Sequence, residues 1–136
     1  MPQPTTHLDA FVMSLERCLQ SSGFITAFYG RFLESSDEVK AKFERTDFGA
    51  QEKRLERSLR TMAGVMVGDL ESLRHLNARA ISHDRYHLDI RPDLYELWRQ
   101  ALLTTAREFD RDWSPFTEES WGVILENAIA YMTKRY

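Results

Sequence analysis

The chain has 136 residues, four histidines and one cysteine, and its formal net charge at pH 7 is −3. This length fits a single domain over residues 1–136, with a core large enough to fold without disulfides. The slightly acidic balance argues against nucleic acid as a partner, and no apolar run approaches the roughly 18 residues of a membrane span. The N-terminus has no signal-peptide pattern and Cys18 stands alone, so we expect a cytoplasmic protein.

Apolar residues recur at helical spacing along nearly the whole chain, which predicts an all-α fold of six or seven helices without strands. The first helix follows Thr5 or Thr6, either of which can cap it. "FITAFYGRFL" then supplies a second helix with an aromatic inner face. A short third helix follows Ser35, whose spacing to Glu38 is that of a capping box, and ends near Phe43.

A long helix follows, with Asp47 as its predicted cap and an apolar stripe of Leu55, Leu59, Met62 and Met66. Gln51 lies one turn before this stripe and on the same face. The next helix carries Leu70, Leu73, Leu76, Ala80 and His83, and it must end before Pro92. Pro92 is suited to the first position of the following helix, and the last helix runs from about Thr117.

Two of the four histidines stand one helical turn apart, in "SHDRYHLDI". On a shared helix face, the rings of His83 and His87 can point the same way and hold a metal. Zinc requires a third or fourth ligand, however, and no glutamate or cysteine pair supports it. Spacing alone therefore favours a structural or surface role. His7 and His75 lie on polar stretches, and we expect both to be solvated.

Tyr29 and Gln51 are polar groups at positions where the helical pattern is apolar. A buried tyrosine hydroxyl needs a hydrogen-bond partner, which a backbone carbonyl or solvent could also provide. Gln51 stands near a helix start, where an exposed side chain is the plain alternative. Phe43 closes a short helix just before a polar corner, a place typical of an ordinary core residue.

Taken in order, these features form a family pattern. "FYGRFL" followed by "DEVKAKF", then "AQEKRL", then "SHDRYHLDIRPDLYELW", is similar to successive segments of globins. The chain resembles the bacterial single-domain haemoglobins and the haem domains of flavohaemoglobins from about residue 8 to 135. Leu33 and Asp37 depart from the common phenylalanine and proline of that pattern. The resemblance implies a three-over-three helical sandwich of about six to eight helices around a haem pocket.

The resemblance assigns the iron ligand to the last of these segments. It implies that His83 binds the haem iron, with His87 as the competing candidate. An insertion of about two residues between His83 and Ile90 reconciles the spacing with that of bacterial relatives. His87 would then meet a haem propionate, and Arg85 and Arg91 are further propionate candidates.

The ligand-binding side of the pocket is implied by the earlier segments. Tyr29 and Gln51 would donate hydrogen bonds to bound oxygen, whose partial negative charge they stabilise. Phe43 would pack against the haem edge. The remaining haem contacts implied by the resemblance are apolar or aromatic and comprise Leu33, Leu55, Ile90 and Tyr95.

The implied function is that of a monomeric or homodimeric globin with haem b (iron protoporphyrin IX), which reversibly binds oxygen, nitric oxide and carbon monoxide. One alternative is a haem enzyme, a nitric oxide dioxygenase or a peroxidase-like protein, which would need a separate reductase. A second is a gas-sensing or non-haem regulatory globin that acts through a partner protein. A third is a helical interaction module without a cofactor.

Overall fold

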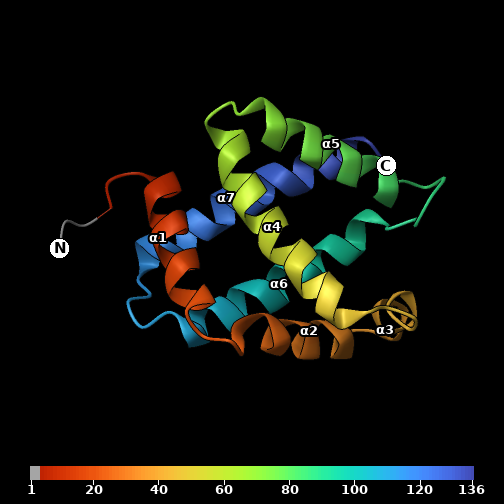
Figure 1. Cartoon of the computed structure of the whole chain (residues 1–136), viewed down its shortest axis with the longest axis horizontal. Coiled ribbons are helices and arrows are strands. Elements are labelled where there is room, and N and C mark those ends of the chain that lie inside the picture. Colours follow the sequence, from red (N-terminus) through yellow and green to blue (C-terminus); the bar gives the residue numbers. More distant parts are fainter. Residues whose placement is uncertain (1–3) are drawn as a thin grey trace.

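The computed structural model describes residues 4–136, which form seven α-helices and no strand (Figure 1). The helices in chain order are α1 (His7–Leu19), α2 (Phe24–Glu34), α3 (Asp37–Lys42), α4 (Phe48–Met66), α5 (Leu70–His83), α6 (Pro92–Phe109) and α7 (Pro115–Lys134). The predicted all-α fold is confirmed. None of the helices in residues 4–136 is both long enough and apolar enough to cross a membrane.

The six long helices pack as two layers of three. In one layer α4 packs against α1 and α5, and in the other α6 packs against α2 and α7. Figure 1 shows α4 crossing over α7, and the short α3 at the end of the molecule near α2. Between the layers, the fully buried Trp121 meets Phe11 edge-on, with ring centroids 4.8 Å apart. Large buried rings of this kind supply much of the apolar area that stabilises a small domain.

Side-chain caps set where five of the helices begin. Thr6 accepts a hydrogen bond from the backbone N–H of Asp9, and Asp47 does the same for Ala50, as predicted. The predicted cap of α3 was one residue too early, because Ser36 rather than Ser35 accepts from the N–H of Val39. The hydroxyl of Ser35 instead donates to a carbonyl at the end of α2. The remaining capped helices begin after Asp69 and Ser114.

Three residues of the predicted apolar stripes lie at the surface of the corner between α4 and α5. Met66 and Leu73 are each 41% exposed, and Leu70 is 65% exposed. At this corner α4 and α5 lie close together, since a Cβ added to Gly64 would be 2.9 Å from Cβ of Ser72. Deeper in the molecule the same stripes are buried at Leu59 and Leu76.

A buried carboxylate joins α1 to the end of α6. Asp110 accepts hydrogen bonds from the hydroxyl of Ser14 at 2.6 Å, from Nη2 of Arg17 at 2.9 Å and from the backbone N–H of Asp112 at 2.9 Å. Ser14 in turn accepts from the indole N–H of Trp121 at 2.8 Å. Burial alone would raise the pKa of Asp110, but the hydrogen bonds from Arg17 and Ser14 outweigh it and hold the pKa below its usual value.

Asp110→Ala is expected to lower the free energy of unfolding by about 3 kcal/mol, because Arg17 and Ser14 lose their buried acceptor. Urea unfolding followed by circular dichroism at pH 7 measures the change, with the exposed Asp112→Ala as the matched control. Since the folded pKa of Asp110 is lowered, its stabilisation is complete above the unfolded value of 3.8 and disappears as the pH falls through the folded pKa. The difference between variant and wild type should therefore shrink in acid. Equal stability of the two variants at pH 7 would contradict this role.

The crossing of α4 and α5 requires a glycine. A Cβ added to Gly64 would lie 2.1 Å from Oγ and 2.9 Å from Cβ of Ser72. Ser72 cannot easily move away, because its backbone N–H and its hydroxyl both donate to Asp69, the cap of α5. The absent side chain therefore sets how closely the two helices approach.

Gly64→Ala is expected to destabilise the fold by about 1–3 kcal/mol through this clash. Gly30→Ala provides the control, because Gly30 lies in α2 with nothing within 4 Å of its added Cβ. Alanine there should be neutral or stabilising by up to about 1 kcal/mol through its better helix propensity. Thermal unfolding of both variants measures the contrast. If Gly64→Ala is as stable as Gly30→Ala, the close approach is not a constraint on the fold.

Candidate functional site

A cavity of about 400 Å³ opens between the two layers, and every long helix except α1 contributes to its wall. Seven of the ten site residues predicted from the sequence line it, namely Tyr29, Phe43, Gln51, Leu55, His83, Ile90 and Tyr95. The other three, Leu33, Arg85 and His87, lie outside the wall. Leu33 instead lines a second hollow together with Phe43 and Phe48.

His83 is the last residue of α5 and is partly buried. The hydroxyl of Ser82 donates to the carbonyl of Arg79 at 3.0 Å, and the same oxygen lies 2.9 Å from Nδ1 of His83. Because the hydroxyl proton is already used, Nδ1 carries the hydrogen of that second bond and Nε2 keeps its lone pair. Burial lowers the pKa of His83, so the ring is neutral at pH 7. This tautomer is the one a metal-binding imidazole needs.

Tyr29 of α2 and Gln51 of α4 form a hydrogen-bonded pair in the cavity wall. Nε2 of Gln51 donates to the hydroxyl oxygen of Tyr29 at 3.1 Å, and Arg54 donates to Oε1 of the same amide at 3.3 Å. The guanidinium thus fixes which end of the amide faces the phenol. Burial raises the pKa of Tyr29 to about 12, so the phenol keeps its proton at neutral pH. With its oxygen already accepting from Gln51, the O–H of Tyr29 is oriented to donate elsewhere.

Aromatic rings hold Tyr29 in place. Phe43 packs edge-on against Tyr29 and Phe32, with centroids 5.8 Å and 5.9 Å apart. Phe48 packs against Tyr29 from the start of α4, at 5.5 Å, and stacks on Phe43 at 6.0 Å. Sequence reasoning missed Phe48, because its position between Asp47 and Gly49, which are both exposed, gives no local signal that its ring packs inward.

His83 and His87 do not share a helix face, contrary to the expectation from their spacing. α5 ends at His83 because the side chain of Asp84 accepts hydrogen bonds from the backbone N–H of Tyr86 at 2.9 Å and from Nδ1 of His87 at 2.7 Å. Such a turn around an aspartate competes with the continuation of a helix. His87 is exposed, and its hydrogen bond to Asp84 lowers the pKa of that carboxyl group.

Comparison with known proteins agrees with the helical fold and with the cavity described above. A model of the Globin family matches residues 26–132. The chain belongs to the globin family. A crystal structure from Pseudomonas aeruginosa PAO1, described as structurally highly homologous to a human haemoglobin, is 37% identical with a TM-score of 0.91. The match covers 96% of this chain and 98% of the other. No curated protein matches the chain.

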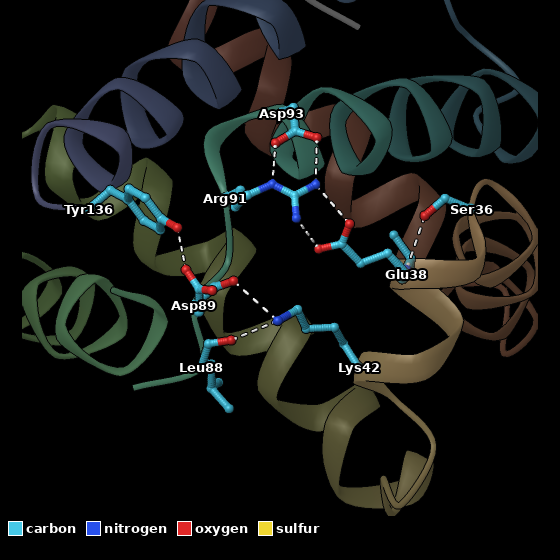
Figure 2. Close-up of polar contacts among 9 residues, drawn as sticks. Ser36, Glu38, Lys42, Leu88, Asp89, Arg91, Asp93 and Tyr136 are labelled. Carbon is cyan, nitrogen blue, oxygen red and sulfur yellow. Dashed lines mark hydrogen bonds and ion pairs between the residues drawn. The ribbon is translucent and has the colours of Figure 1, made fainter. Parts of the chain in front are cut away.

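The corner after α5 is tied to distant parts of this globin (Figure 2). Arg91 forms a fork with Glu38 of α3, at 2.6 Å and 2.7 Å, and a second contact with Asp93 at 3.1 Å. Lys42 of α3 donates to the carbonyls of Leu88 and Asp89, and the hydroxyl of Tyr136 bonds Asp89. The segment between His83 and Ile90 is therefore an anchored loop.

Arg85 contacts the backbone carbonyl and the ring of Tyr136. Its Nε donates to the carbonyl of Tyr136 at 3.1 Å, and its guanidinium lies 4.9 Å from the centre of that ring. Asp89 has a φ of 53°, a left-handed conformation that aspartate tolerates better than most residues. The backbone N–H of Ile90 then returns to the carbonyl of His83 at 2.9 Å, which fixes the end of α5.

Two histidines expected to be solvated make contacts instead. His7 lies 2.8 Å from the hydroxyl of Ser120 and stacks on Phe116. His75 lines the cavity, as does Arg79, one turn further along α5. The interval of four residues from His75 to Arg79 to His83 was the available signal, because it places all three on one helix face.

The residues of the cavity fit the haem group that the globin family implies. A neutral imidazole with a free nitrogen, an adjacent pair of hydrogen-bond donors and a mainly apolar wall suit an iron porphyrin. Among the residues described, no group of three or more His, Cys, Asp or Glu side chains could hold a metal ion by itself.

Proposed function

We propose that this globin binds haem b through Nε2 of His83 and reversibly binds oxygen, nitric oxide and carbon monoxide. The carrying observation is that one cavity is lined by His83 in its ligand tautomer and by the paired donors Tyr29 and Gln51. Haem, when bound, supplies an iron that takes one protein ligand and one gas molecule.

The protein's own residues perform three tasks in this proposal. Ser82 and the carbonyl of Arg79 hold the imidazole of His83 in one orientation. The O–H of Tyr29, oriented by Gln51, provides a donor for a gas ligand that carries partial negative charge. Leu55 and Ile90, with the rings of Phe32 and Phe43, line the cavity with apolar surface that keeps water away.

Absorption spectroscopy tests the function directly. The purified protein is titrated with haemin, reduced, and exposed to carbon monoxide. A saturable Soret band that shifts with carbon monoxide is the expected result, because only a pocket-bound haem responds stoichiometrically. A protein that gives no such band after reconstitution is not a haem globin, and the proposal then fails.

A further inference from the structure

The cavity wall is unbalanced in charge. Its basic side chains are Lys42, Arg54 and Arg79, with the histidines His75 and His83, while no aspartate or glutamate of residues 4–136 lines it. The chain as a whole has a net charge of −3, so this local excess is not a reflection of composition. A mainly apolar cavity with cations and no carboxylate is suited to a flat apolar ligand that carries acidic groups.

Arg79 and His75 leave polar atoms without partners in this wall. Nε of Arg79 and Nε2 of His75 are both buried and make no hydrogen bond within the described chain. Arg79 is one helical turn before His83, and His75 is one turn before Arg79. Buried polar groups are nearly always paired in native proteins, because an unpaired one costs roughly 1–3 kcal/mol. Their shared place on α5 indicates that a ligand supplies the missing acceptor.

The basic groups of the corner over residues 84–91 are already engaged. Arg91 is held by Glu38 and Asp93, as Figure 2 shows. Arg85 donates to the carbonyl of Tyr136, and His87 is bonded to Asp84. Neither Arg85 nor His87 lines the cavity. A carboxylate at this corner would have to displace existing partners, whereas one at Arg79 would satisfy an unpaired atom.

We propose, on the basis of the haem-binding function above, that a carboxylate of the porphyrin binds the guanidinium of Arg79, with His75 beside it. The acidic edge of the porphyrin then lies along α5 and not at the corner over residues 84–91. Arg79 thereby contributes to cofactor binding through both its backbone and its side chain. Its carbonyl accepts from Ser82, which orients His83, and its side chain pairs with the porphyrin.

Iron-free protoporphyrin IX is the probe, because its binding does not require the iron ligand. Quenching of protein fluorescence reports its affinity, since Trp98 lines the cavity. Arg79→Gln is expected to weaken binding about ten-fold or more, the effect of losing one charge-assisted hydrogen bond. Arg74→Gln is the matched control, because Arg74 lies on the same helix, is exposed and pairs only with Glu71. Arg79→Lys keeps the charge without the fork and should bind with intermediate affinity.

The dimethyl ester of protoporphyrin IX, delivered in dilute detergent, separates charge recognition from structural damage. Wild type and Arg79→Gln should bind the ester equally, because it carries no carboxylate. An equal loss for acid and ester would make Arg79 a structural residue and overturn the proposal. The proposal would also be overturned if Arg79→Gln bound protoporphyrin IX as tightly as wild type while Arg85→Gln or His87→Gln bound it more weakly. Failure of the haem-binding function itself would appear differently, as a wild type that gives no Soret band with haemin.

Discussion

Haemin-loaded protein carrying His83→Gly is expected to lose its Soret band and to regain it when imidazole is added. The glycine variant removes the ring whose Nε2 is free in the cavity while leaving space for a soluble imidazole. Since the iron would lose the one imidazole that the proposal assigns to it, haem affinity should fall by at least 100-fold, or roughly 3 kcal/mol. A haemin titration with and without imidazole measures both the loss and the rescue.

His87→Gly is the matched control, since it removes the second histidine of the same segment. We expect it to retain the band, because the ring of His87 is exposed, bonded to Asp84 and outside the cavity wall. The reverse pattern, with the band lost in His87→Gly and kept in His83→Gly, would transfer the ligand role to His87. Circular dichroism of both apoproteins shows whether either variant has lost its helices.

The side of the site formed by Tyr29 and Gln51 was predictable, because it depends on residue spacing within single helices. Tyr29 lies on the aromatic face of its helix, and Gln51 lies one turn before Leu55. Helical periodicity alone therefore directs both side chains toward the interior. Their hydrogen bond confirms that they meet, which no pattern within one helix could establish. Phe48 escaped notice because a ring at a helix start points inward only once α2 is packed beside it.

The side of the site that carries His83 was less predictable, because the side-chain hydrogen bonds of Asp84 end the helix there and override the helical spacing. His83 and His87 match a shared face only if the helix continues, and Asp84 stops it by bonding Tyr86 and His87. An aspartate followed by three polar or aromatic residues is compatible with both outcomes, so the sequence could not decide between a continued and an ended helix.

The four-residue spacing to Arg79 and His83 places His75 on their helix face, but whether that face lines a cavity depends on tertiary structure. His75 lies in the largely polar stretch "ESLRHLN", which favours solvent, but α5 packs against α4 close to Gly64 and its inner face lines the cavity. The same packing leaves Met66 and Leu70 outside. Helical period predicts which residues share a face, and it does not predict which part of that face another helix will cover.

Tyr29→Phe is expected to speed oxygen dissociation from the haem-loaded globin about ten-fold or more. The substitution keeps the ring and its packing against Phe43 and Phe48, so only the buried hydroxyl is lost. One such hydrogen bond contributes on the order of 1.4 kcal/mol, which corresponds to a ten-fold change in rate. Stopped-flow mixing of the oxygenated protein with excess carbon monoxide measures the dissociation rate.

The same substitution at a second tyrosine of the cavity provides the control. Tyr95 also lines the wall, and burial raises the pKa of its hydroxyl, but Gln51 pairs with Tyr29 and orients that hydroxyl alone. Tyr95→Phe should therefore change the rate less than two-fold, or by under about 0.4 kcal/mol. Gln51→Leu should give an intermediate increase, because Tyr29 keeps its proton but loses its orientation. An unchanged rate in Tyr29→Phe would remove the phenol from ligand binding, and a larger effect at Tyr95 would assign the donor to α6.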